Sequence, residues 1–444
     1  MSDPRETIVT AQKQHAEGKT QDAYRTLRGV FSGVGESLRD DALFFDAISL
    51  LATLSHTFGA TKVSAALKQC VAKRDDTQML YDAAYQLYEE QQFAPASALL
   101  FRANRLAPGQ PGIIAELSSA LEAQLRYGEA ALVLEQSNTA ETEPLCAYLA
   151  GFNWLMTGDL ERASSHLKRL ATETDERMVF QRNMLAGMVA RAEAMRAAGI
   201  SLEGLALTAW QGAINGTVLL HESPHGYEQP MHGRYAFVSD SAGLQREGLE
   251  RLKVVLSATN SAPARIVSAP GRESRLLGLA AAKTLGAPVA EWTPGSEKGA
   301  LVVAWTLESV PTDELLKALS THAPANRLFV HASSWVEPFG YAPDVTTLLH
   351  QTITHPYAGG ALRVDPATQK VTRSEPDTRA DEVLVEEIVA AKISDPSKTS
   401  LEHVTRVTGA LRSVDASHRA GLFAQSGRRL RQRAGGPVLS NRFL

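Results

Sequence analysis

Three histidines and several acidic residues lie close together between residues 221 and 240. The possible ligands are the imidazoles of His221, His225 and His232 and the carboxylates of Glu222, Glu228 and Asp240. Three imidazoles would leave one zinc coordination position open for water, the arrangement of catalytic zinc sites. Their spacing matches no familiar zinc motif, so the alternative is a hairpin or loop whose histidines bind nothing. A divalent metal is therefore one candidate ligand of this segment.

A second run of polar and aromatic residues extends from residue 331 to residue 357. Its notable side chains are His331, Trp335, Glu337, Asp344, His350 and His355. Aromatic residues and prolines at this density after a predicted strand are typical of an ordered connection. We expect either a wall beside a ligand site or an ordinary packed connection.

The elements that would position these residues form an α/β pattern. Short apolar runs predict strands at 217–221, 235–239, 264–270, 301–305 and 327–333. Apolar residues spaced three and four apart predict helices at 246–259, 274–286 and 312–322. Strands that alternate with helices predict a mostly parallel sheet covered on both faces.

Ligands of such sheets bind beyond the carboxyl ends of the strands, which selects the loops after Ser268 and Trp305. The first loop reads SAPGRESR and enters a helix, whose N-terminal N–H groups and arginines suit a phosphate or carboxylate. The second reads TLESVPTDELL, where Ser309 or Thr312 could instead only cap the next helix. The candidate ligand-binding residues are Ser268, Gly271, Arg272, Ser274, Arg275, Thr306, Glu308, Ser309 and Thr312.

Residues 264–333 resemble the core of a type I phosphoribosyltransferase. The resemblance rests on a strand, a short loop, a small-residue helix and the sequence Leu285-Gly286-Ala287-Pro288. It implies a pyrophosphate loop and a phosphate-containing ligand. The family's next strand ends in two acids that hold the ribose hydroxyls, and Ala304 and Trp305 stand there instead. The resemblance therefore implies a ligand-binding domain without transferase activity. No nucleophile elbow, Walker loop, kinase set or dinucleotide glycine fingerprint occurs.

The first half of the chain carries an internal repeat. Residues 80–108 place Ala84, Leu87, Ala96 and Leu100 at fixed offsets before Pro108, and similar residues recur 34 and then 33 positions further on. Small side chains at fixed spacing allow antiparallel helices to cross closely. The pattern resembles tetratricopeptide repeats and predicts a helical solenoid, with a generic helical bundle as the alternative. Residues 177–198 are expected to form a helix that closes the array.

Solenoids of this class expose a groove on their first helices, in which a partner protein or peptide lies. Aromatic residues suit such a surface because they supply contact area with little entropy to lose. The candidate partner-binding residues are Tyr81, Tyr85, Tyr88, Glu116, Asn153 and Trp154.

Length, charge and cysteine content frame these expectations. A chain of 444 residues predicts several domains, for which we expect boundaries at 1–199, 200–370 and 371–444.

The net charge of -4 gives no general attraction to nucleic acid or membrane, although arginines gather after His418. These could dock on an acidic partner or on the chain's own acidic stretch after Val371. Two cysteines cannot form a disulfide framework, and the first residues do not resemble a secretory signal, which favours the cytoplasm.

Two functional hypotheses follow. The first is a cytoplasmic scaffold or adaptor in which the repeat array binds a protein and the α/β domain is a second, non-catalytic binding module. The second is a phosphoribosyltransferase-like or other enzyme for a nucleotide or phosphate ligand, regulated by the repeat array.

Overall fold

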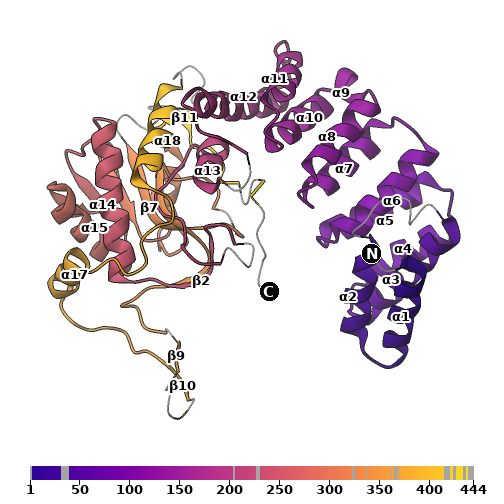
Figure 1. Cartoon of the computed structure of the whole chain (residues 1–444), viewed down its shortest axis with the longest axis horizontal. Coiled ribbons are helices and arrows are strands. Elements are labelled where there is room, and N and C mark those ends of the chain that lie inside the picture. Colours follow the sequence, from indigo (N-terminus) through magenta and orange to yellow (C-terminus); the bar gives the residue numbers. More distant parts are fainter. Residues whose placement is uncertain are drawn as a thin grey trace. The chain divides into compact units, whose positions relative to one another are not determined.

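The structure is a computed structural model of the whole chain (Figure 1). It describes residues 3–31, 40–203, 206–226, 231–322, 326–337, 339–360, 362–364, 368, 370–414, 421–423, 427–433 and 437–438. The chain divides into two compact units, Met1–Leu185 and Ala186–Leu444. Glu228 lies outside the described residues, and so do Arg419 and Arg442, two of the arginines that gather after His418.

The first unit is helical. Its helices are α1 (Pro4–Ala16), α2 (Thr20–Phe31), α3 (Asp41–Thr57), α4 (Thr61–Ala72), α5 (Thr77–Glu89), α6 (Phe93–Leu106), α7 (Pro111–Glu122), α8 (Tyr127–Gln136), the short α9 (Thr139–Thr142), α10 (Pro144–Met156), α11 (Leu160–Arg169) and the first part of α12 (Glu176–Ala197). From α1 to α11 each helix packs against the next in the chain, so the core is built from contacts between sequence neighbours.

Local signals in the sequence set the helix ends of this unit. The side chains of Asp40 and Asp76 accept hydrogen bonds from the first backbone N–H groups of α3 and α5, which satisfies groups that the helix itself leaves unpaired. Pro111 and Pro144 stand at the first positions of α7 and α10, where the missing N–H of proline costs nothing. Helix starts therefore follow from residue type.

The second unit contains a seven-stranded sheet whose described pairings are all parallel. Its strands are β1 (Val218–Leu219), β2 (Tyr235–Ser239), β3 (Ile266–Ser268), β4 (Val289–Glu291), β5 (Leu301–Ala304), β7 (Arg327–Ser334) and β8 (Val345–Thr354). The order is β1-β8-β7-β5-β3-β4, and β2 pairs with β8. The expected mostly parallel sheet is confirmed.

Alternate side chains of each strand enter different cores. On β5, Leu301 and Val303 belong to a cluster that includes α14 (Ala242–Ala258) and α15 (Arg272–Leu285). Val302 and Ala304 belong to another cluster, with Leu315 of α16 (Asp313–Leu319). Helices therefore cover both faces of the sheet, as buried parallel strands require.

Strand β8 corrects two sequence expectations. Residues 331–357 are a packed connection only between the end of β7 at Ser334 and the start of β8 at Val345. The rest was not expected: Val345–Thr354 is strand β8, which pairs with β7 on one edge and with β1 and then β2 on the other. Residues 217–239 are not a hairpin, because both of their strands run parallel to β8. The strand was missed because its polar side chains imitate a loop. Those of Val345–His350 are buried instead, and Thr346 Oγ1 lies 3.0 Å from Ser333 Oγ.

Three further helices complete the second unit: α13 (Leu207–Asn215), α17 (Asp381–Ala390) and α18 (Leu401–Ser413). Helix α17 packs on α14 and α15, and α18 packs on α13 and α14. Two two-stranded ribbons pair β9 (Leu362–Val364) with β10 (Val371–Arg373) and β6 (Thr321–His322) with β11 (Gly427–Arg428). Within the described part of the chain, no helix has the length and apolar character needed to cross a bilayer.

Candidate functional site

Four of the expected partner-binding residues gather on α5 and α7. Tyr81, Tyr85 and Tyr88 are spaced four and three apart and therefore share one face of α5, and Tyr85 is 44% exposed. Burial raises the pKa of the Tyr81 hydroxyl, and the nearby charge of Glu116 on α7 raises it further. Burial, then Glu122, Glu116 and Glu89, raise the pKa of Tyr88. The result is a half-buried surface that combines phenol rings with negative charge.

The other two expected partner-binding residues lie in the core. Asn153 is fully buried and donates to Glu122 Oε2 at 3.2 Å and to the Leu149 carbonyl at 2.9 Å. The Trp154 indole N–H donates to Glu135 Oε1 at 2.8 Å, and Arg162 stacks over the ring. Both side chains position α10 against its neighbours and present little surface to a partner.

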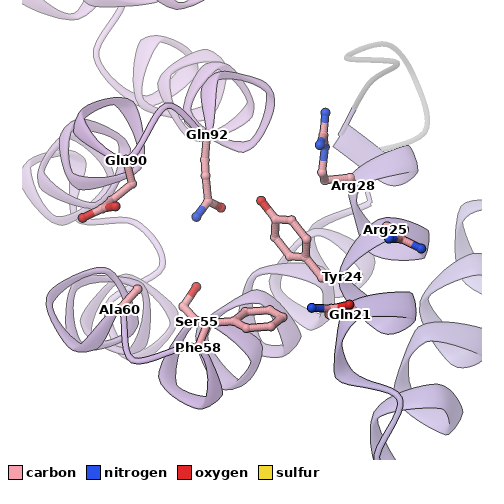
Figure 2. Close-up of a pocket in the computed structure, with 9 residues that line it drawn as sticks. All are labelled: Gln21, Tyr24, Arg25, Arg28, Ser55, Phe58, Ala60, Glu90 and Gln92. Atoms are coloured by element: carbon pink, nitrogen blue, oxygen red, sulfur yellow. The ribbon is translucent and has the colours of Figure 1, made fainter. Parts of the chain in front are cut away.

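A pocket that the sequence did not reveal opens elsewhere in the helical unit, where α2, the α3–α4 turn and the α5–α6 turn meet. It has a volume of about 510 Å³ and is lined mainly by polar and aromatic side chains (Figure 2). Its residues come from distant parts of the sequence, and no motif joins them.

In the second unit, the two arginines expected to bind phosphate are already paired. Arg272 Nε donates to Asp381 Oδ1 at 3.1 Å, and its other nitrogens donate to the carbonyls of Asp377 and Arg379. Arg275 donates to Asp381 Oδ2 at 2.9 and 2.6 Å. Both guanidinium groups therefore hold the start of α17 against α15, and a phosphate would have to displace Asp381.

The remaining residues of the two expected ligand loops mostly bond to each other. The Ser274 hydroxyl accepts from the Trp305 backbone N–H at 3.1 Å, and the Thr306 hydroxyl accepts from the Ser309 N–H at 3.1 Å. Ser268 is buried, Gly271 precedes α15 at a φ of 105°, and Thr312 precedes α16 without a side-chain cap. Loss of hydration raises the pKa of the Glu308 carboxyl, and repulsion from Glu337 adds to this.

Below these loops, at the carboxyl ends of the strands, lies a buried cluster centred on Asp240. Its carboxylate accepts from Gln245 Nε2 and Trp305 Nε1, each at 2.8 Å, and from His331 Nε2 at 3.1 Å. Burial alone would raise the pKa of Asp240, but the charge of His331 and these hydrogen bonds hold it below its usual value. Trp305, which occupies the position of an acid in the phosphoribosyltransferase pattern, therefore acts as a donor to a carboxylate from another strand.

Two neutral histidines border this cluster. Burial lowers the pKa of His350 and of His355 to about 4. The His355 ring contacts Trp305 edge-on, with centroids 4.9 Å apart. The sequence grouped these histidines with His331, and the structure does bring all three near Asp240.

The expected zinc triad does not form. His221 is buried between Glu247 Oε2, 2.9 Å from its Nδ1, and the Tyr235 hydroxyl, 2.8 Å from its Nε2. His225 is exposed and lies 3.4 Å from Asp395, and His232 sits in a turn with a φ of 46°. Across the described ranges, no group of three or more His, Cys, Asp or Glu side chains is placed to hold a metal ion. The His221 ring is therefore buried because both of its nitrogens have hydrogen-bond partners, and not because it binds a metal.

Part of the arginine-rich end of the chain is structural. Arg429 is buried and pairs with Asp344 at 2.7 Å, while its Nε donates to the Leu319 carbonyl at 2.9 Å. It therefore holds the chain that follows β11 against Asp344 and Leu319 and is not available to an acidic partner.

The structure thus defines a two-unit chain, one unit helical and the other a parallel α/β sheet with a buried polar cluster. No family model matches the chain, and no curated protein matches it. Solved structures do match, among them one described as MamA AMB-1, which is 16% identical. That match covers 40% of this chain and 96% of the other, with a TM-score of 0.24. At this TM-score and identity the similarity carries no conclusion about fold or function.

Proposed function

We propose that this chain is a cytoplasmic interaction protein whose helical unit is a tetratricopeptide-like solenoid that binds a basic peptide segment of a partner. The observation that carries the proposal is the face of α5 and α7, where exposed Tyr85 lies beside half-buried tyrosines and several acids.

The packing of the repeat positions supports the solenoid. The small residues that recur at the expected offsets, Ala84, Ala96, Ser118, Ala130 and Gly151, are all buried. At Gly151 an added Cβ would lie 2.8 Å from Leu185 Cδ2 and 3.3 Å from His166 Cβ. Helices approach so closely there that a larger side chain could not fit. Close crossing at regular intervals is what stacked helix pairs need.

The charge of the face determines the kind of partner. Burial and then repulsion from Glu89 raise the pKa of Glu116, so its negative charge lacks a compensating partner strong enough to hold that pKa down. A lysine or arginine of a bound peptide would relieve this repulsion and could stack on a tyrosine ring. Such a segment complements the face better than an acidic or purely apolar one.

The α/β unit fits a second, non-catalytic binding module better than an enzyme. The phosphoribosyltransferase alternative requires Arg272 or Arg275 to meet a phosphate, and both are engaged by Asp381. The domain boundaries 1–199, 200–370 and 371–444 stay part of this proposal, with the difference that α17 and α18 of the last segment pack on helices of the α/β unit.

The proposal is tested by affinity capture from a lysate of the source organism with the full chain as bait. Tyr85→Ala and Glu116→Gln should each reduce recovery of a partner tenfold or more, the size expected for an interface hot spot. Glu161→Gln is the charge-matched control, since Glu161 is exposed on α11. A captured partner should elute with salt and should bind through a Lys- or Arg-rich segment. If the wild type and all three variants capture the same amount of partner, the proposal is wrong.

A further inference from the structure

The pocket of the helical unit has a polar centre made by three side chains from different elements. Figure 2 shows Tyr24 of α2, Ser55 of α3 and Gln92 before α6 pointing toward one another. Ser55 is only 3% exposed, yet its Oγ has no hydrogen-bond partner, and neither has the buried Oε1 of Gln92. Buried polar atoms without partners cost roughly 1–3 kcal/mol each, so the two atoms that converge on this open pocket are positions that water or a polar ligand group would fill.

The chemistry of the three groups specifies that ligand. Hydroxyl groups donate and accept, and a carboxamide offers both an N–H donor and a carbonyl acceptor. An amide group of a ligand also offers one N–H donor and one carbonyl acceptor. It can therefore pair with the Gln92 carboxamide in either orientation of that side chain. A carboxylate alone would leave the acceptor of Gln92 unsatisfied, whereas an amide would satisfy it.

The rim of the pocket adds two preferences. Arg25 and Arg28, one turn apart on α2, line it together with one carboxylate, that of Glu90. Arg25 also lies 3.6 Å from Asp22 at an exposed position. The two guanidinium groups outnumber the lining carboxylate and favour an acidic neighbour of the bound amide. Phe58 is 48% exposed and contacts Tyr24 edge-on, with centroids 5.7 Å apart. Its free face offers contact to an apolar side chain. The volume of about 510 Å³ lies within the usual range of ligand pockets, roughly 300–1,000 Å³.

We propose that this pocket binds a peptide segment through an amide group held by Tyr24, Ser55 and Gln92, with an acidic residue next to that amide. The site uses none of the residues of the α5–α7 face and selects the opposite charge. The helical unit therefore has two peptide sites of different specificity, and the second does not depend on the first.

The test is saturation-transfer NMR on the full chain with capped tetrapeptides at millimolar concentration. The probe is acetyl-Leu-Asn-Asp-Leu-amide. One control replaces Asp with Asn and removes the acid, and another replaces Asn with Leu and removes the side-chain amide. If the pocket binds the Asn side-chain amide, the peptide with Leu in place of Asn should not bind. If the pocket binds a backbone amide, that peptide should still bind. Either result supports the site.

Variants locate the binding. Ser55→Ala should weaken the probe about fivefold, the effect of one lost hydrogen bond, while leaving the fold intact because it removes only an unpaired hydroxyl. Tyr24→Phe keeps the ring contact with Phe58 and should act in the same direction. Arg25→Gln should weaken binding of the acidic probe more than binding of its neutral counterpart. Lys68→Gln, which removes the same charge from an exposed position on α4, should change the binding of neither peptide. Failure of all three peptides to bind, or binding that Ser55→Ala and Tyr24→Phe leave unchanged, would overturn the proposal.

Discussion

The Asp240 carboxylate and the His331 imidazole are both completely buried and lie 3.1 Å apart, joined by a hydrogen bond from Nε2 to Oδ1. Asp240 directly follows β2 and His331 belongs to β7, so the pair links two strands that are not neighbours in the sheet. Trp305 adds a third strand end to the same carboxylate. This polar centre therefore fixes the carboxyl edge of the sheet.

Removal of the Asp240 charge should destabilise the second unit severely. Asp240→Asn keeps the size of the side chain but leaves donors of Gln245, Trp305 and His331 without their anionic acceptor. Breaking one partner of a buried pair costs about 3–5 kcal/mol, and urea unfolding followed by circular dichroism would measure it. Asp395→Asn, which removes only the exposed contact with His225, should change the free energy of unfolding by less than about 0.5 kcal/mol. Similar values for the two variants would contradict this role.

The protein should lose stability as the pH falls from about 6.5 to about 4. In this range the unfolded chain protonates His350 and His355, but in the folded state their pKa values are lowered to about 4. The unfolded state binds more protons, so each histidine makes stability rise with pH by up to about 1.4 kcal/mol per unit. Urea unfolding at several pH values would show this slope. His350→Gln should flatten it, and an unchanged slope in that variant would show that His350 does not titrate as described.

The pairing of Asp381 with Arg272 and Arg275 should stabilise α17 on α15. Asp381→Ala should lower the free energy of unfolding by about 1–3 kcal/mol, the range for hydrogen bonds to charged groups, because it removes bonds to two guanidinium groups at partly exposed positions. A double-mutant cycle with Arg275→Ala would isolate the pair. If both arginines are occupied, phosphoribosyl pyrophosphate should leave the melting temperature of the wild type unchanged. A clear rise in melting temperature would instead support the alternative that the α/β unit binds a phosphate ligand.

Replacement of glycine by alanine should have opposite effects on stability at Gly248 and at Gly409. A Cβ at Gly248, on α14, would overlap Thr347 of β8, with Cγ2 at 2.8 Å and Oγ1 closer, so Gly248→Ala should cost about 1–3 kcal/mol. At Gly409, an exposed position on α18, an added Cβ would meet no neighbouring atom within 4 Å, so Gly409→Ala should stabilise the helix by about 0.5–1 kcal/mol. Thermal unfolding measures both. A neutral Gly248→Ala would mean that α14 and β8 can separate slightly at no cost.

The sequence predicted elements well where local signals specify them. Strand β2 was expected at 235–239 and lies at Tyr235–Ser239, and the helix expected at 177–198 is found at Glu176–Ala197. Apolar periodicity and caps are local, so they can be read from one segment. Strand β8 was missed because its threonines and His350 are polar, and their burial depends on strands and helices far away in the sequence. Helix α18 was also missed, although Ser400 caps it and Val404, Val407 and Leu411 form one apolar face.

The candidate sites were only partly predictable, for the same reason. Tyr81, Tyr85 and Tyr88 share a helix, so their common face follows from spacing alone. Whether Arg272 is free depends on Asp381, more than a hundred residues away, and no local pattern reveals that pairing. The pocket of Tyr24, Ser55 and Gln92 likewise exists only after three helical elements have packed.

The position of β8 also affects how the protein folds during synthesis. The helical unit is built from contacts between sequence neighbours and can pack progressively as it leaves the ribosome. Strands β1 and β2 must wait, because the partner on which both align, β8, ends at Thr354, more than a hundred residues after β2. During that interval the backbone groups of both strands lack their native partner, so this part of the sheet cannot form until β8 has been synthesised.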